Sequence, residues 1–555
     1  MNGHRAPESD VVLITGETHV DHPLSASGVI ARVLESAGFS VGIIEHPDWK
    51  SDADFFRRGA PRLFFGITSG SIDSLLVNYT PLKRRREKDE NAPYRSAMPD
   101  RAVLVYTHKV RALFPGVPVV LGGIEASLRR FAHYDYWDDK VRRGLLLDSR
   151  ADILVYGPGE LAAVEIARRL ADGRDLQGIA GTCVVRKEVP GNFTEIPSAE
   201  AVAASPEAFA EAQMKFSVRA PLAQRHDTRY VLQYPAPRYT PGDLDRIYGL
   251  PYSRMIPLGF PEFRMAQFSV VTHRGCFGRC SFCSLALHQG ETIVSRSEES
   301  ILDEIRRLVR HADFKGYIDD LGGPTANMYG MDCDTACGKP CLGCSRLPSS
   351  HERLISLLGK ARAIPGVKKV FVRSGIRYDL ALSSEKYIRE LVGHHVSGLL
   401  KIAPEHVSKK VLRMMNKDSG EAFEKFRRAF RKADASGRQH LKYYYMVAHP
   451  GCGPEEAREL AREVRRLEKE GDRPIEGVQI FTPTPMTLST AMYHTGRDPR
   501  TAEPVHVPRT FQEVKEQKRM LAAGTRKERA RPGVKRSARL GRTETVPPSF
   551  RGRKR

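Results

Sequence analysis

The feature that most constrains the fold is a regular alternation of short apolar runs with amphipathic helical patterns. In the N-terminal third of the chain, the apolar runs end in polar or Gly-rich segments. Runs of this length, separated by helical segments, are typical of parallel strands covered on both faces by helices. The sequence therefore predicts an α/β protein with a parallel-sheet domain over residues 1–175. The apolar runs lie at 10–16, 39–46, 61–70, 117–127 and 151–160.

Ligands of such sheets bind beyond the carboxyl ends of the strands. The segments that follow the predicted strands should therefore lie along one edge. These segments are residues 15–21, 66–71, 122–125 and 157–160.

A second α/β series begins at the predicted strand FSVVT (268–272) and continues for six β/α units. Its first long helix, within SRSEESILDEIRRLVRHA, places Ile301, Ile305, Leu308 and Val309 on one face. Six units are too few for a closed eight-stranded barrel, so residues 263–500 are expected to form a partial (β/α)6 barrel. In barrels of this kind, the chemistry occurs at the C-terminal ends of the strands.

The remaining segments are less regular. Residues 176–262 are rich in proline and are predicted to be a connector between the two series. Residues 501–555 are predicted to be a basic low-complexity tail, in which 518–555 hold 14 Lys and Arg against two Glu. This segment therefore carries +12 of the total net charge of +22, which leaves +10 for the other 517 residues, so the rest of the chain is only mildly basic. The tail is interpreted as a disordered solubilising extension, or alternatively as an arm that binds RNA or the ribosome through phosphates.

Composition and the N-terminus indicate the compartment. There is no run of about 18 apolar residues, and MNGHRAPESDVVLIT has no apolar core of a signal peptide. We therefore expect a cytoplasmic protein with no membrane contact. Seven of the nine cysteines fall between residues 276 and 344, and in a cytoplasmic protein such clustering favours metal binding over disulfides.

The stretch THRGCFGRCSFCS (272–284) carries Cys276, Cys280 and Cys283 in C-x3-C-x2-C spacing, directly after a predicted strand. Three thiolates on such a loop can hold three irons of a [4Fe–4S] cluster and leave the fourth iron open. The alternative is a zinc ion with His273 or His288 as fourth ligand. Zinc motifs usually contain two C-x2-C pairs, and this motif contains one.

With Phe282 before its last cysteine, this motif resembles that of the radical S-adenosylmethionine (SAM) superfamily. The resemblance implies that SAM chelates the open iron and that reduction of the cluster cleaves SAM to a 5′-deoxyadenosyl radical. It also implies an electron donor, such as a flavodoxin or a ferredoxin-like protein. The likeness is closer to YgiQ-type radical SAM proteins and covers about residues 10 to 500. The segments that carry it include VDHPLSASGVIARVLE, LGGIEASLRRFAHYDYWDD, YIDDLGGPTANMYGMDC, KIAPEHVSKKVLRMMNK and FTPTPMTLSTAMYHT.

The superfamily pattern also implies residues that contact SAM. Gly322 and Gly323 end the second strand of the barrel, where backbone groups meet the amino end of SAM. Glu405 in KIAPEH matches a polar position for the SAM carboxylate or ribose, although a surface salt bridge is the alternative interpretation. Ser374 and Arg373, at the end of the third strand, are weaker candidates.

A second set of cysteines follows in a Cys-rich insertion over residues 327–350. Cys337, Cys341 and Cys344 repeat the C-x3-C-x2-C spacing, and Cys333 stands four residues earlier. Four thiolates would close a metal site, so this set is predicted to be an auxiliary site for [4Fe–4S] or zinc. Cys183 and Cys452 are predicted to be lone structural thiols.

The N-terminal domain resembles the flavodoxin-like, cobalamin-binding domains of some superfamily members. The Asp-x-His-x-x-Gly signature of a cobalt ligand is absent, because His19, Asp21 and His22 have other spacings. Either cobalamin binds without a histidine ligand or the domain retains only the fold. Three functions follow: a radical SAM enzyme of unknown substrate, a cobalamin-dependent radical SAM methyltransferase, and a non-catalytic metal-bound RNA-binding protein.

Overall fold

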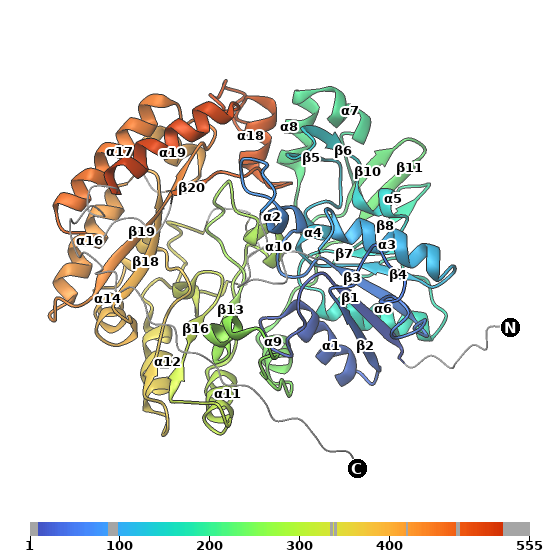
Figure 1. Ribbon diagram of the computed structural model, residues 1–555, viewed down its shortest axis with the longest axis horizontal. Coiled ribbons are helices and arrows are strands. Elements are labelled where there is room, and N and C mark those ends of the chain that lie inside the picture. Colours follow the sequence, from blue (N-terminus) through green and yellow to red (C-terminus); the bar gives the residue numbers. More distant parts are fainter. Residues whose placement is uncertain are drawn as a thin grey trace, which may run out of the picture.

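The computed structural model describes residues 9–86, 98–333, 337, 341–417, 420–472 and 478–525. They form two α/β domains that lie side by side, with the N-terminal domain on the right in Figure 1 and the C-terminal domain on the left. Within the described ranges, no helix is both long and apolar enough to cross a membrane. The predicted fold class, a parallel-sheet domain followed by a partial barrel, is confirmed.

The N-terminal sheet begins with five parallel strands in the spatial order β2-β1-β3-β4-β7. Alternate side chains of β1 face opposite sides of the sheet. Val12 and Ile14 pack in the cluster that contains Tyr106 of α3, whereas Val11 and Leu13 pack with helices α1 and α6 on the other face. Helices therefore cover both faces, as the apolar runs predicted. The elements are β1 (Val11–Thr15), α1 (Ala26–Ser36), β2 (Val41–Glu45), β3 (Phe64–Thr68), α3 (Ala102–Leu113), β4 (Val119–Leu121), α4 (Gly123–Ser127), β7 (Ile153–Val155) and α6 (Glu160–Ala171).

The structure differs from the predicted connector over 176–262. Four strands from this range extend the N-terminal sheet in the order β8-β11-β10-β9, and β7-β8, β8-β11 and β11-β10 are antiparallel. The cause is burial: Leu222, Ala223, Val231 and Leu232 are almost fully buried in the sheet core. The flanking prolines obscured this short hairpin in the sequence. The strands are β8 (Thr182–Arg186), β9 (Thr194–Ile196), β10 (Leu222–His226) and β11 (Arg229–Gln233).

The C-terminal domain is a partial barrel whose strands follow one another in chain order. β12 pairs with β16, β15 with β17, and β18 with β19 and β20, all in parallel. The backbone hydrogen bond from Leu321 N to Phe371 O links the second strand position to the third. The strands are β12 (Ser269–Val271), β15 (Tyr317–Ile318), β16 (Asp320–Gly322), β17 (Lys369–Val370), β18 (Leu399–Glu405), β19 (His440–Val447) and β20 (Val478–Ile480).

Amphipathic helices cover the outside of the barrel. In α11, the side chain of Ser297 caps the N-terminus by accepting from Ser300 N, and Ile301, Ile305 and Leu308 are buried, as predicted. Val309 is partly buried against the same core. The helices are α11 (Glu298–Val309), α12 (Glu352–Ala363), α14 (Glu385–Glu390), α16 (Glu421–Ala433) and α17 (Pro454–Lys469). A further helix, α18 (Leu488–Thr495), packs against α8 (Pro206–Lys215) of the N-terminal domain.

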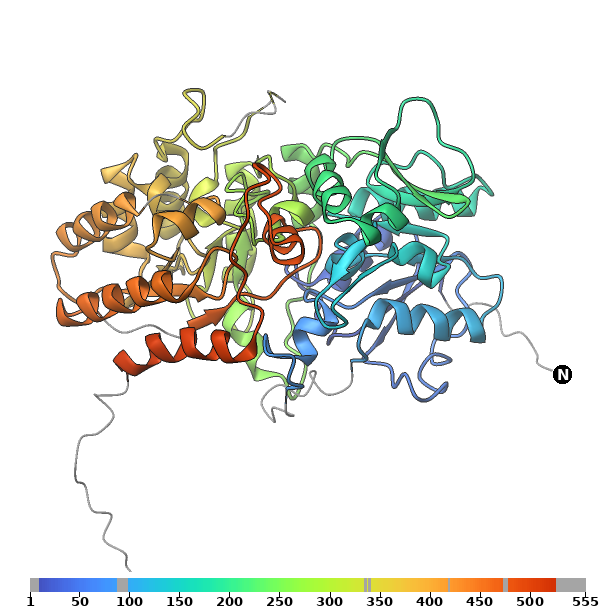
Figure 2. The ribbon, with the colours of Figure 1, turned by 90° about the horizontal axis from the view of Figure 1, so that it is seen from above.

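The predicted basic tail begins too early in the chain. Residues 511–525 form helix α19 (Phe511–Thr525), which lies along α17 at the outside of the barrel (Figures 1 and 2). Gln517 and Leu521 are 1% exposed, so this helix belongs to the folded domain. The rest of the predicted tail, residues 526–555, lies outside the described residues.

Candidate active site

The three-cysteine loop leaves the end of the first barrel strand and is closed at its base by a short antiparallel pair. β13 (His273–Arg274) pairs with β14 (Val294–Ser295), so residues 275–293 form one loop. Gly275 has φ +87°, and a Cβ there would lie 2.0 Å from the carbonyl oxygen of Thr292. Only glycine fits this position, because any side chain would collide with backbone. The contact with Thr292 therefore fixes the backbone conformation of the loop just before Cys276.

The three thiols converge within this loop. Cys283 N donates to Cys280 O at 3.0 Å, so a tight turn joins these two residues. Burial, with smaller contributions from the neighbouring Cys280 and Cys276, raises the pKa of Cys283 to about 12. A Cβ on Gly278 would lie 2.7 Å from Arg377 Nη1 and 3.4 Å from Cys276 Sγ, so a side chain at this position would crowd both groups.

The donor set fits a [4Fe–4S] cluster better than a single metal ion. Among the described residues, no three Cys, His, Asp or Glu side chains are close enough together to hold one ion. A cluster needs a wider spacing because each thiolate binds a different iron. The histidines of the zinc alternative have contacts elsewhere: His273 Nδ1 is 2.8 Å from Thr272 Oγ1, and His288 Nδ1 is 3.1 Å from Ser127 Oγ.

The predicted SAM-contacting glycines occupy a crowded strand end. A Cβ on Gly322 would lie 2.8 Å from Ser374 Oγ, and one on Gly323 would lie 2.6 Å from the His273 ring. The Ser374 hydroxyl donates to the carboxylate of Asp320, which also accepts from the backbone N–H of Ser374 and Arg373. Ser374 is therefore held against the glycines by Asp320.

Arg373 lies apart from this group. Its side chain is exposed, and its guanidinium stands over the ring of Phe371, 5.1 Å from the ring centroid. Because its guanidinium is exposed and lies over Phe371, Arg373 is the weakest of the predicted SAM contacts.

Glu405 ends β18 in an unusual conformation. Its φ is +66°, which is a strained value for a residue with a side chain, and the strand register shifts just before it. The Glu405 side chain is 12% exposed and lies 3.8 Å from Lys417 Nζ. Burial raises the pKa of Glu405, and Lys417 opposes that rise. Its carboxylate also raises the pKa of Cys283, so the structure brings it near the cysteine loop.

Sequence reasoning missed two side chains that contact the cysteines. Arg377 Nη1 points at Cys280 Sγ at 3.8 Å while its guanidinium is ion-paired with Asp379. Thr325 Oγ1 lies 3.4 Å from Cys276 Sγ. Thr325 follows the two glycines and was quoted with them, but no local signal marks Arg377, which is 97 residues from Cys280 along the chain.

The second cysteine set repeats the local geometry of the first. Cys344 N donates to Cys341 O at 3.0 Å, the same turn as in the first loop. Burial raises the pKa of Cys341, and Cys333, Cys337 and Cys344 add to the rise. The four thiols are thus within electrostatic range of one another. Residues 334–336 and 338–340 of the predicted insertion lie outside the described residues.

The two predicted lone thiols are buried. Cys183 is fully buried in the N-terminal sheet, where burial raises its pKa to about 12. Cys452 is also fully buried, and its sulfur lies 3.5 Å from His406 Nε2 and 3.2 Å from Gln517 Oε1. Cys452 therefore has specific partners, which its isolated place in the sequence did not indicate.

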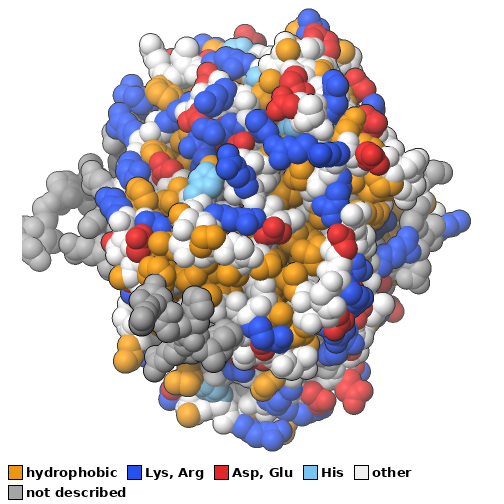
Figure 3. Space-filling model, turned by 90° about the vertical axis from the view of Figure 1, so that its right-hand side faces the viewer, with side chains coloured by type: hydrophobic (Ala, Val, Ile, Leu, Met, Phe, Trp, Pro, Cys, Tyr) orange, Lys and Arg blue, Asp and Glu red, His pale blue; other side chains and the backbone are white. Residues whose placement is uncertain are grey.

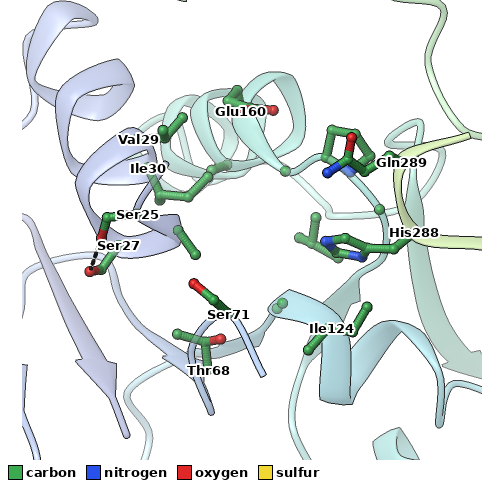
Figure 4. Close-up of a pocket in the computed structure, with 18 of the residues that line it drawn as sticks. Ser25, Ser27, Val29, Ile30, Thr68, Ser71, Ile124, Glu160, His288 and Gln289 are labelled. Atoms are coloured by element: carbon green, nitrogen blue, oxygen red, sulfur yellow. Dashed lines mark hydrogen bonds between the residues drawn. The ribbon is translucent and has the colours of Figure 1, made fainter. Parts of the chain in front are cut away.

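A cavity of about 390 Å³ lies between the two domains (Figure 4). One wall is the edge formed by the carboxyl ends of β3, β4 and β7. The other is made by His273 and Arg274 at the base of the cysteine loop and by Leu285, His288 and Gln289 near its end. Three of the four segments predicted for this edge, 66–71, 122–125 and 157–160, contribute to the cavity wall, whereas residues 15–21 do not line it. Its lining includes Ile30, Thr68, Ser71, Gly122, Gly123, Ile124, Gly157, Gly159, Leu285, His288, Gln289 and Gly323.

Comparison with known proteins identifies the family. A model described as "Radical SAM N-terminal" matches residues 1–269, "Radical SAM superfamily" matches 270–464, and "Domain of unknown function (DUF3362)" matches 476–525. A UPF0313 protein of Methanocaldococcus jannaschii is 45% identical over 540 residues, covering 92% of this chain and 89% of its own length. One from Geobacter sulfurreducens is 46% identical, covering 93% and 89%. The chain belongs to the UPF0313 family.

The fold of this UPF0313 protein is similar to solved radical SAM structures. TsrM from Kitasatospora setae, with cobalamin and a [4Fe–4S] cluster bound, has a TM-score of 0.52 at 18% identity, covering 92% of this chain and 84% of TsrM. OxsB with aqua-cobalamin bound has a TM-score of 0.50 at 13% identity, covering 90% and 57%. The expected membership of the YgiQ-type radical SAM family is confirmed.

The UPF0313 chain is thus a radical SAM enzyme that uses a [4Fe–4S] cluster and SAM. The non-catalytic alternative that its composition allowed is set aside. Within the site, Cys276, Cys280 and Cys283 would hold the cluster.

Proposed function

We propose that this enzyme cleaves SAM reductively at a cluster held by Cys276, Cys280 and Cys283. The observation that carries the proposal is three converging thiols on a glycine-locked loop at the end of the first barrel strand. With three protein ligands, one iron stays open for the amino and carboxylate groups of SAM. When bound, the cluster supplies the electron that breaks SAM into methionine and a 5′-deoxyadenosyl radical.

The residues around the cluster would bind and orient SAM. The Cβ positions of Gly322 and Gly323 are occupied by Ser374 and His273, so these two residues would offer backbone groups to the amino end of SAM. Ser374 supports those glycines, and Glu405 would accept hydrogen bonds from the ribose or the ammonium group. Arg377 donates toward Cys280 Sγ and would stabilise the negative charge of the thiolate-bound cluster.

The test is anaerobic reconstitution of the full chain followed by reduction with dithionite in the presence of SAM. We expect iron and sulfide to accompany the protein and 5′-deoxyadenosine to accumulate. Cys280→Ala should abolish the product, whereas Cys183→Ala, a change at a buried thiol of the other domain, should retain it. Iron-loaded wild type that never forms 5′-deoxyadenosine would overturn the proposal. In the cell, a flavodoxin or ferredoxin-like protein would supply the electron.

A second candidate function is the use of a corrinoid cofactor, as in a cobalamin-dependent methyltransferase. It is supported by the cavity between the sheet edge and the cysteine loop. This cavity lies at the carboxyl ends of the strands, where α/β sheets bind ligands. The similar structures TsrM and OxsB hold cobalamin. The test is incubation with hydroxocobalamin and gel filtration; a corrinoid spectrum that does not co-elute with the protein would exclude this function.

The second cysteine set is proposed to hold an auxiliary metal, with a [4Fe–4S] cluster ahead of zinc, because among the described residues no three of these thiols are close enough together to hold one ion. Its support is the repeated C-x2-C turn and the mutual electrostatic effect of the four thiols. Metal analysis of Cys333→Ala tests the four-ligand assignment. Unchanged metal content and thermal stability would show that Cys333 is not a ligand.

A further inference from the structure

His288 places an imidazole in the cavity between the domains. It lies on helix α10 (Leu285–Gln289) of the cysteine loop, and its ring projects toward the cavity (Figure 4). Helix α10 can sit this close to the N-terminal sheet because Gly157 has no side chain. A Cβ on Gly157 would lie 3.0 Å from the carbonyl oxygen of His288.

The hydrogen bonds of Ser127 determine the tautomer of His288. The single hydroxyl proton of Ser127 is donated to Gly123 O at 2.8 Å, and the Gly157 N–H donates to Ser127 Oγ at 3.0 Å. With the Ser127 proton on Gly123 O, the contact of 3.1 Å between Ser127 Oγ and His288 Nδ1 is a donation from the histidine. Nδ1 carries the proton, and Nε2 carries the lone pair.

The ring remains neutral at physiological pH. Burial lowers the pKa of His288 to about 4, and Glu160 opposes the shift only in part. Among the described residues, Nε2 has no hydrogen-bond partner. A neutral imidazole whose Nδ1–H is fixed by an oxygen acceptor is oriented in the way that metal-ligating histidines are.

The cavity does not offer the other ligands that a free metal ion would need. Of its described lining residues, Glu160 is the one with a carboxylate, and that carboxylate is ion-paired with Arg274 at 2.6 Å. The lining holds one further imidazole, His273, whose Nδ1 lies 2.8 Å from Thr272 Oγ1, and no three donor side chains of the described residues are close enough together to hold one ion. Most of the other lining residues are glycines, hydroxyl-bearing residues and aliphatic residues. A metal bound to His288 must therefore bring its own equatorial ligands, as the cobalt of a corrin ring does.

We propose that His288 Nε2 is the protein's axial ligand to the cobalt of a corrinoid bound between the domains. This inference rests on the second proposed function and adds the ligand that the N-terminal sequence lacks. A corrinoid is larger than the first cavity, but a second cavity of about 690 Å³ adjoins it. Gly157, Arg274, His288 and Gln289 line both cavities, so His288 stands at the junction of the available space.

The test uses cobinamide, a corrinoid without the dimethylbenzimidazole base that could itself supply an axial nitrogen. Full-length protein is loaded with cobinamide, reduced to the Co(II) state and measured by electron paramagnetic resonance. We expect each cobalt line to split into three through one ¹⁴N nucleus of the protein. His288→Gln should remove the splitting and weaken cobinamide binding about tenfold or more. His394→Gln, the same change at a half-exposed histidine that lines neither cavity, should retain the splitting.

Each outcome is decisive. Bound cobinamide without a three-line pattern in the wild type would overturn the role of His288 and leave the corrinoid function standing. A pattern that persists in His288→Gln would assign the nitrogen to another residue. Failure to retain either cobinamide or hydroxocobalamin would overturn both proposals. Iron content and circular dichroism of His288→Gln, equal to those of the wild type, show that the variant is folded.

Discussion

Arg274 Nη2 lies 2.6 Å from Glu160 Oε1, and this buried ion pair joins the two domains beside the interdomain cavity. Tyr239 OH also donates to Glu160, at 2.8 Å, and Tyr248 OH accepts from Arg274 Nε at 2.9 Å. Burial raises the pKa of Glu160, but the Arg274 guanidinium outweighs it and holds that pKa below its ordinary value. The contact between the two domains therefore includes a buried ion pair with hydrogen bonds to two tyrosines.

Breaking this pair should loosen the joint. Glu160→Gln leaves the Arg274 charge buried without its counter-ion, and we expect a loss of about 3–5 kcal/mol in the free energy of unfolding. Denaturant titration measures it. Arg246→Gln breaks the exposed pair with Asp243 and should cost less than about 1 kcal/mol. Equal losses in the two variants would show that the interdomain pair does not stabilise the joint.

The iron content of the reconstituted protein should depend on Gly275 far more than on Gly290, although both lie in the cysteine loop. Gly275→Ala and Gly290→Ala both place a side chain at positive φ, which costs about 1–3 kcal/mol. Only Gly275→Ala also collides with the Thr292 backbone, since Gly290 has open space around its Cβ position. We expect Gly275→Ala to lose most of its iron after reconstitution and Gly290→Ala to keep it. Similar iron content in the two variants would show that the close contact of Gly275 with the Thr292 backbone is not needed to hold the cluster.

Acidification should destabilise the protein through its buried histidines. Burial lowers the pKa of each to about 3 or about 4, so the folded protein keeps them neutral while the unfolded chain takes up protons below about pH 6.5. Stability is therefore lost as pH falls from about 6.5 toward 4, by about 1.4 kcal/mol per pH unit for each fully shifted group. The histidines are His22, His133, His226, His273, His288, His351, His406 and His449.

His226 is the sharpest single test, because neither of its ring nitrogens has a hydrogen-bond partner within the described part of the chain. His226→Gln should flatten the pH profile of unfolding between pH 6.5 and 4.5. His394→Gln, at a half-exposed side chain, should leave it unchanged. A profile that is the same in wild type and His226→Gln would refute the buried-neutral assignment.

Helix α19 should be held on the barrel by one side chain. Gln517 Oε1 accepts from Ala448 N at 2.8 Å and from Cys452 Sγ at 3.2 Å, and its Nε2 donates to Cys452 O at 2.8 Å. Gln517→Ala leaves buried backbone groups unsatisfied, so we expect a cost of about 2–4 kcal/mol. Gln512→Ala, on the exposed side of the same helix, should cost less than about 0.5 kcal/mol. Thermal melting of both variants decides the point.

The basic segment 526–555 should contribute non-specific RNA affinity. It holds 12 Lys and Arg against two Glu, and each phosphate that they neutralise releases counter-ions. Elsewhere, as on the face in Figure 3, basic side chains are interspersed with acidic and apolar ones. Deletion should weaken binding to a generic RNA and reduce its salt dependence. A variant of equal length with these residues changed to Ser should behave like the deletion, and unchanged affinity in both would remove the arm from consideration.

The sequence predicted what local patterns encode. The spacing of Ile301, Ile305 and Leu308 indicated the buried face of α11, and the C-x3-C-x2-C motif indicated a loop that carries three thiols after the first barrel strand. The contacts of Arg377 with Cys280 and of His288 with Ser127 join residues 97 and 161 positions apart. Such contacts depend on how the domains pack, which periodicity does not record. The antiparallel extension of the N-terminal sheet was missed for a related reason, because short strands between prolines gain their stability from burial against other strands.

The order of the strands along the chain has a consequence for synthesis. The nine-stranded sheet is complete at Gln233, before any barrel strand begins, so it can fold while the rest of the chain is still on the ribosome. Until the nascent chain reaches residue 274, Glu160 faces water with no counter-ion. The cysteine loop then folds against an N-terminal sheet that is already formed. Iron can therefore be bound only late in the folding of the chain.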